Sequence, residues 1–138
     1  MQTYVLVHGA WHTGRELTSV AAMIGSAGHQ VFTPTIKGNG PGDARTIGLP
    51  EAIASIVDFL IAHDLKDIVL VGHSYGGMII TGVADRVGDR IRRLVYWNAA
   101  ASTQPAIACG ITSDWVANPG IEQWSCLARS RTLPRNSV

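Results

Sequence analysis

Short apolar runs alternate with apolar positions at helical spacing along residues 1–98 of this chain. The runs at residues 4–7, 30–33, 67–71 and 93–97 are rich in branched and aromatic side chains, and each predicts a strand. The first run is apolar throughout, which is typical of a strand buried on both faces of a parallel sheet.

Three helices are predicted between these strands. The first begins at Thr13, because Thr13 and Glu16 have the S/T-x-x-E spacing of a capping box, and it ends near Gly28. Pro50 suits the first turn of the second helix, and Gly88 closes the third. The apolar positions at helical spacing are Leu17, Val20, Ala21 and Ile24; Ile53, Ile56, Val57, Leu60 and Ile61; and Ile79, Ile80, Val83 and Val87.

Strands that alternate with helices predict an α/β fold with a parallel sheet. Right-handed crossovers place helices on both faces of such a sheet, so we expect three layers. Ligands of these sheets bind beyond the carboxyl ends of the strands. Residues 8–11 and residues 72–76 each follow a predicted strand, so both segments are expected to face one crevice.

Residues 72–76, Gly-His-Ser-Tyr-Gly, match the G-x-S-x-G pattern between a predicted strand and a predicted helix. The glycines make room for a sharp turn that holds Ser74 in a strained conformation and presents its hydroxyl. The helix N-terminus behind the turn favours an oxyanion beside that hydroxyl. The alternative is a glycine-rich turn in which the serine has no chemical role.

Composition narrows the classes of function. The chain has 138 residues, 46% hydrophobic and 15% charged, with a net charge of +1, as expected for one globular domain. No cluster of lysine and arginine predicts nucleic-acid binding, and no apolar run predicts a membrane span. The two cysteines form no metal-binding spacing. We therefore expect a cytoplasmic protein with no metal, whose N-terminus enters a strand without a signal peptide.

The segment of residues 99–138 differs in character from the rest. It contains no lysine and no histidine, and serine, arginine and proline accumulate towards its end. No strand or helix period runs through it, and an irregular stretch of this length is uncommon within a compact domain. We expect an irregular C-terminal tail after a core of residues 1–98.

Residues 4–11 (YVLVHGAW), the loop at 38–40 and residues 68–78 (IVLVGHSYGGM) resemble the α/β-hydrolase superfamily. The nearest branch is that of the small esterases related to plant methylesterases and hydroxynitrile lyases. The resemblance covers the N-terminal half of that fold, up to about residue 98.

This resemblance implies site residues. It makes Ser74 the nucleophile and the backbone N–H groups of Ala10 and Tyr75 the oxyanion-hole donors. Trp11 and His12 would line the substrate pocket. Members of this kind use no cofactor and no metal, and they act on small-molecule esters.

One departure from the family pattern concerns the base. In this fold the catalytic residues follow the order Ser, Asp or Glu, His, but all five histidines of this chain precede Ser74. A serine hydroxyl without a positioned base is a weak nucleophile. His12 is the one histidine placed to approach Ser74, while His8 is expected to hold its own loop and His73 to pack in the core.

Three functions remain open. The first is esterase-type hydrolysis through Ser74, and the second is a catalytically inactive, truncated hydrolase that lacks the acid and histidine. The third is a hydroxynitrile-lyase-like reaction, which is disfavoured because that branch has threonine where this chain has Gly9.

The abrupt end of the resemblance suggests that residues from about 99 onward are a frame-shifted or replaced tail. The alternative is a genuine but divergent cap. Translation of the other two reading frames after Asn98 distinguishes the two, because a frame shift predicts a strand, an acid and a later histidine in one of them. The last predicted strand would also be left as an open sheet edge, so self-association is expected.

Overall fold

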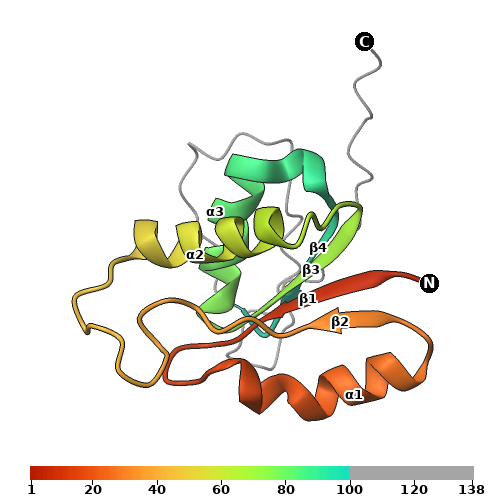
Figure 1. The fold of residues 1–138 in the computed structure, drawn as a ribbon, viewed down its shortest axis with the longest axis horizontal. Coiled ribbons are helices and arrows are strands. Elements are labelled where there is room, and N and C mark those ends of the chain that lie inside the picture. Colours follow the sequence, from red (N-terminus) through yellow and green to blue (C-terminus); the bar gives the residue numbers. More distant parts are fainter. Residues whose placement is uncertain (100–138) are drawn as a thin grey trace, which may run out of the picture.

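A computed structural model describes residues 1–99, and these form a four-stranded parallel sheet. The strand order is β2-β1-β3-β4, so β1 and β3 are central and the connection from β2 to β3 passes across β1 (Figure 1). The strands are β1 (Thr3–Val7), β2 (Gln30–Phe32), β3 (Ile68–His73) and β4 (Ile91–Trp97).

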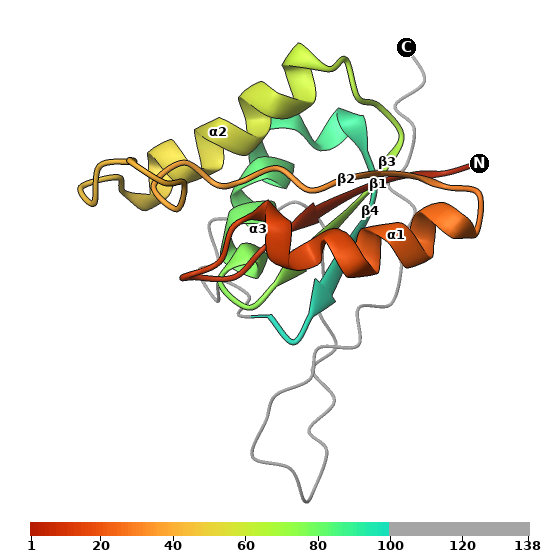
Figure 2. The same ribbon diagram turned by 60° about the horizontal axis from the view of Figure 1, so that its bottom comes forward.

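Helices cover both faces of the sheet, as the alternating pattern predicted. Helix α1 (Thr18–Ser26) lies on one face, and α2 (Leu49–Ala62) and α3 (Gly76–Val87) lie on the other (Figures 1 and 2). Short 3-10 turns at Gly14–Leu17 and Gly88–Arg90 precede α1 and β4. The predicted α/β class with three layers is therefore confirmed for the part of the chain that is described.

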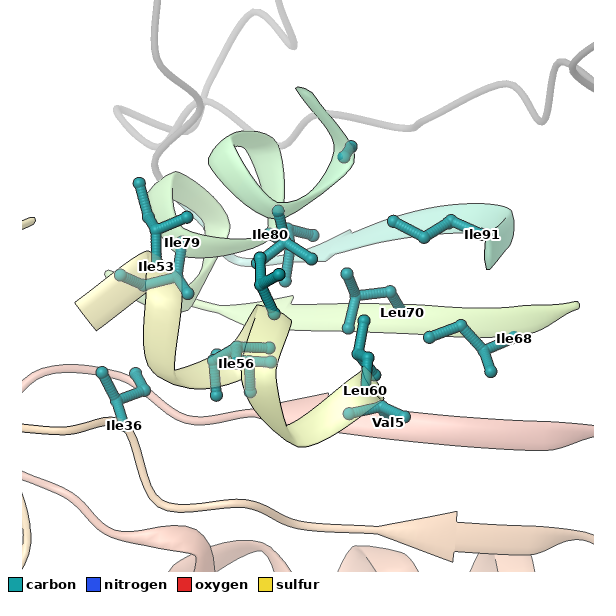
Figure 3. Packing of buried hydrophobic residues seen from close by; sticks show 14 of the residues in the cluster. Val5, Ile36, Ile53, Ile56, Leu60, Ile68, Leu70, Ile79, Ile80 and Ile91 are labelled. Carbon is teal, nitrogen blue, oxygen red and sulfur yellow. The ribbon is translucent and has the colours of Figure 1, made fainter. Parts of the chain in front are cut away.

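The core lies mainly between the sheet and the pair α2 and α3. Its side chains come from both central strands and both helices, and they interlock across this layer (Figure 3). Helix α1 buries none of its residues, so the opposite layer is thinner. The largest fully buried apolar side chains are Ile36, Ile56, Leu60, Ile68, Leu70, Ile79, Ile80, Val5, Val7 and Val83.

Register aligns the carboxyl ends of the central strands. Val7 of β1 pairs with Gly72 of β3, and His73 pairs with Trp97 of β4. The segments that follow β1, β3 and β4 therefore leave the sheet at the same end, beyond the carboxyl ends of the strands. This alignment places every predicted site residue within the same region.

Strand β4 pairs only with β3 among residues 1–99, so self-association through its outer edge stays a prediction. The proposed replacement of the tail concerns residues 100–138, which lie outside the described part of the chain. No helix within residues 1–99 has the length and apolar character that crossing a membrane requires.

Candidate active site

Ser74 occupies the turn between β3 and α3. Its φ is +52°, in the left-handed region that a serine rarely adopts, and the residue is exposed. The carbonyl oxygen of Ser74 accepts a hydrogen bond of 3.0 Å from the N–H of Gly77, which closes the turn. The predicted backbone of a nucleophile elbow is confirmed.

Two glycines make this turn sterically possible. A Cβ at Gly72 would lie 2.6 Å from the carbonyl oxygen of Gly76. A Cβ at Gly76 would lie 2.5 Å from the carbonyl oxygen of Val7 and 2.7 Å from that of His8. All three neighbours are backbone atoms that cannot rotate away, so α3 begins in direct contact with the end of β1.

The loop after β1 lies against the elbow. A Cβ at Gly9 would stand 3.1 Å from the Cβ of Ser74 and 3.4 Å from Nδ1 of His73. The two strand ends therefore meet at the elbow, as expected. Beyond Gly9 the loop is exposed: Ala10 faces solvent, and Trp11 has a φ of +64° and is 93% exposed.

Helix α3 begins where the two strand ends meet. Its first backbone N–H groups lie in the turn beside Ser74, where the partial positive charge of a helix end favours an anion. The N–H groups of Ala10 and Tyr75 come from the two segments that meet there. Their use as oxyanion donors stays a prediction, as does a substrate pocket lined by the exposed Trp11 and His12.

His8 is buried and joins two loops. Its Nε2 accepts a hydrogen bond of 2.9 Å from the N–H of Ile36, so Nδ1 carries the proton and donates to the carbonyl oxygen of Gly9 at 2.8 Å. Burial lowers the pKa of His8 from its ordinary value of 6.5, and the bond to Gly9 opposes this shift in part. The expected role of His8, to hold its loop, is confirmed.

The lowered pKa predicts a pH dependence of stability. The unfolded chain binds a proton at His8 as the pH falls below about 6.5, whereas the folded chain resists this proton until a lower pH. The free energy of unfolding should therefore decrease as the pH falls from 7 through this window. Thermal melts between pH 8 and pH 5 test this, and the slope should shrink in His8→Asn.

A parallel variant, His29→Asn, serves as the control because His29 is half-buried at the far end of β1. It should retain the wild-type slope.

Two exposed carboxylates with a lowered pKa affect stability in a separate pH range. Hydrogen bonds donated by Thr13 lower the pKa of Glu16, and hydrogen bonds donated by Lys66 and Arg90 lower the pKa of Asp64. Their contributions disappear only below about pH 4.5 and 3.8 respectively. An unchanged slope in His8→Asn would contradict the assignment of the pH dependence between pH 8 and pH 5 to His8.

Two further aromatic rings lie near that of His73, the residue before Ser74. The rings of His12 and His73 are nearly parallel with centroids 6.5 Å apart, and the indole of Trp97 packs on His73 at 4.8 Å. His73 is half-exposed, so the expectation that it packs in the core was wrong. Trp97 was not among the predicted site residues, although its position at the end of the last predicted strand placed it at the same end of the sheet.

Within residues 1–99, Ser74 makes no side-chain hydrogen bond to a histidine. His63 caps the C-terminal end of α2 and contacts Phe59, whereas His29 directly precedes β2 and contacts Tyr4. The same part of the chain holds no group of three or more metal-ligating side chains. The described residues thus supply an elbow with the loop after β1 packed against it.

A parallel sheet covered on both faces, with a strained serine at a strand–helix turn, is the arrangement of α/β enzymes that use a nucleophile elbow. The family model of the alpha/beta hydrolases matches residues 4–136. The chain belongs to the alpha/beta hydrolase family.

The relatives of this chain include an esterase and a lyase. A carbendazim hydrolyzing esterase from Nocardioides sp. is 47% identical over 102 residues, which are 72% of this chain and 42% of the relative. An alpha-hydroxynitrile lyase from Arabidopsis thaliana is 28% identical, over 85% of this chain and 47% of the relative. This chain spans less than half the length of both.

Solved structures show the same fold. An extracellular alpha/beta-hydrolase from a Paenibacillus species superposes with a TM-score of 0.72 and 37% identity, over 74% of this chain and 42% of that protein. A pyrethroid hydrolase from Sphingobium faniae superposes with a TM-score of 0.63 and 28% identity, over 71% of this chain and 40% of that protein. The resemblance inferred from the elbow and the His-Gly turn is confirmed.

Proposed function

We propose that this chain carries the nucleophile half of an esterase-type serine hydrolase. Ser74 is the nucleophile, and the N–H groups of Ala10 and Tyr75 are the oxyanion donors. The observation that carries the proposal is the exposed Ser74 at φ +52° with Gly9 against it. A structural serine has no need of this strained conformation.

The chemistry is acyl transfer. Ser74 Oγ attacks the carbonyl carbon of an ester, and the negative charge on the carbonyl oxygen is stabilised by the two N–H groups. Expulsion of the alcohol leaves an acyl group on Ser74, and water then releases the acid. The proton of Ser74 must pass to a base, which residues 1–99 do not place on its hydroxyl. Acyl transfer of this kind requires no cofactor.

The substrate class is a small-molecule ester. The names of the relatives support this class, since they include an esterase and a pyrethroid hydrolase. The side chains that would contact the acyl or alcohol group are those of Trp11 and His12, together with the rings of His73 and Trp97. A hydroxynitrile-lyase-like reaction is the lesser alternative; it is disfavoured because the branch that performs it has threonine where this chain has Gly9.

A second candidate is a catalytically inactive hydrolase that still binds ester-like ligands. It is favoured by one observation: no histidine follows Ser74 among the 138 residues. It accounts for an intact elbow without the acid and base that the fold ordinarily supplies later in the chain.

The time course of p-nitrophenyl acetate hydrolysis by the purified chain tests the proposal, with intact mass measured in parallel. Without a positioned base we expect slow nitrophenol release and one acetyl group on Ser74, since acylation and deacylation both need proton transfer. Nitrophenol release no faster than in buffer, with no acetyl group, favours the inactive candidate. Rapid continuous turnover would show that a base reaches Ser74.

A further inference from the structure

Three hydrogen bonds join the loop after β1 to the segment after β2. The N–H of Ile36 donates to His8 Nε2 at 2.9 Å, and the N–H of Gly14 donates to Thr35 Oγ1 at 3.0 Å. Between them, Nδ2 of Asn39 donates to the carbonyl oxygen of His12 at 3.2 Å. The loop of residues 8–14 is thus held at its start, near its middle and at its end by residues 35–39.

Residues 35–40 are themselves held firmly. One carboxylate oxygen of Asp43 accepts the N–H groups of Gly38 and Gly40, at 2.8 and 3.0 Å, on either side of Asn39. The N–H of Asn39 donates to the carbonyl oxygen of Ile36 at 3.0 Å, and the side chain of Ile36 is fully buried in the core. Asn39 therefore sits on a backbone turn anchored to the core at one end and to Asp43 at the other.

The loop that receives these bonds carries the proposed oxyanion donor. Ala10 lies between His8 and His12, whose positions the segment fixes, and it is exposed. Gly9 contacts Ser74, and the ring of His12 stacks on that of His73. An oxyanion donor is effective only when held close to the position that the anion will occupy.

We propose that Asn39, fixed by Asp43, is a positioning residue that holds the loop of residues 8–14 in place for the oxyanion hole. This inference rests on the proposed function for its catalytic meaning. The other two hydrogen bonds reach the buried residues His8 and Gly14, so changes at these residues would also disturb folding. The Asn39 bond lies at the surface, so its loss should loosen the loop and leave the core intact.

Asn39→Leu removes the donor with little change of volume. Amide hydrogen exchange in the peptide of residues 8–14 should accelerate about 2- to 10-fold, the range for one neutral hydrogen bond. Asp43→Leu should do the same, whereas Asp43→Asn keeps an acceptor oxygen and should resemble the wild type. The control is Gln2→Leu, at the other end of the sheet. It removes two exposed bonds: the one of 2.7 Å that the Gln2 amide donates to the carbonyl oxygen of Asp67, and the one of 2.8 Å that Gln2 Oε1 accepts from Arg92.

A second measurement links the loop to the site. Phenylboronic acid forms a boron–oxygen bond with Ser74 Oγ, releases the hydroxyl proton to solvent and leaves a tetrahedral anion. Benzyl alcohol, which is neutral, forms no such bond and carries no anion to the oxyanion donors. Asn39→Leu should lower the affinity for phenylboronic acid about 2- to 10-fold and leave the affinity for benzyl alcohol unchanged. Calorimetric titration of the full chain measures both.

The outcomes separate the two proposals. Unchanged exchange in residues 8–14 of Asn39→Leu overturns the positioning role, and so does faster exchange with unchanged phenylboronic acid affinity. If the wild-type chain binds no phenylboronic acid, the proposed function fails, while faster exchange still supports the hold of Asn39 on the loop. Faster exchange of residues 8–14 in the Gln2→Leu control would show that the whole fold loosens, and it would overturn the specific role of Asn39.

Discussion

Replacement of Ser74 by alanine is expected to abolish covalent labelling of the chain by a fluorophosphonate. In the wild type, Ser74 Oγ forms a bond to phosphorus, fluoride leaves and the hydroxyl proton passes to solvent. The oxyanion donors proposed at Ala10 and Tyr75 stabilise the negative oxygen on phosphorus. Labelling should be slow because no histidine bonds to Ser74 among residues 1–99, but it should stop at one adduct per chain.

Mass spectrometry of the intact chain and of its peptides measures the adduct. Ser19→Ala is the matched control, because Ser19 is also exposed but lies on α1 away from any strand end. It should label at the wild-type rate. Equal labelling of Ser74→Ala and wild type, or an adduct that maps elsewhere, would refute the nucleophile assignment.

Replacement of Gly76 by alanine is expected to destabilise the fold by about 3 kcal/mol, the upper end of the cost of overpacking. The added Cβ would lie 2.5 Å from the carbonyl oxygen of Val7 and 2.7 Å from that of His8. Both belong to the backbone at the end of a central strand, so α3 must move as a whole. Urea denaturation followed by circular dichroism measures the free energy of unfolding.

Gly25→Ala is the control for this substitution. Gly25 lies in α1, and a Cβ there would meet nothing within 4 Å. Alanine should therefore stabilise the chain by roughly 0.5–1 kcal/mol, because it restricts the unfolded backbone. If both variants destabilise alike, the close approach of α3 to β1 is not the cause.

The local parts of this fold could be predicted well from single segments. Thr13 and Glu16 form both hydrogen bonds of the predicted capping box. Strand boundaries were less accurate, since β3 extends to His73 and β4 begins at Ile91. These extra residues belong to the strands because β3 and β4 pair with each other along this length, with an irregular register between Ile68 and Val69. Pairing partners of this kind are distant in sequence, so a local pattern does not reveal them.

The site shows the same division. The glycines around Ser74 predicted its positive φ, since a sharp strand–helix turn has few other solutions. The environment of His73 was predicted wrongly, because it depends on the aromatic ring at the end of the adjacent strand, which the local sequence does not show. That ring belongs to Trp97, 24 residues later and brought beside His73 by the β3–β4 register.

The sequence by itself determined the class of fold, the elbow and the loop-holding role of His8, because each depends on the conformational limits of nearby residues or on hydrophobic periodicity. It gave no sign that the irregular segment at residues 35–40 holds the loop of residues 8–14. That contact joins Asn39 to His12 across the ends of β2 and β1. It exists because the sheet order places these strands side by side, and sheet order is set by packing of the whole chain.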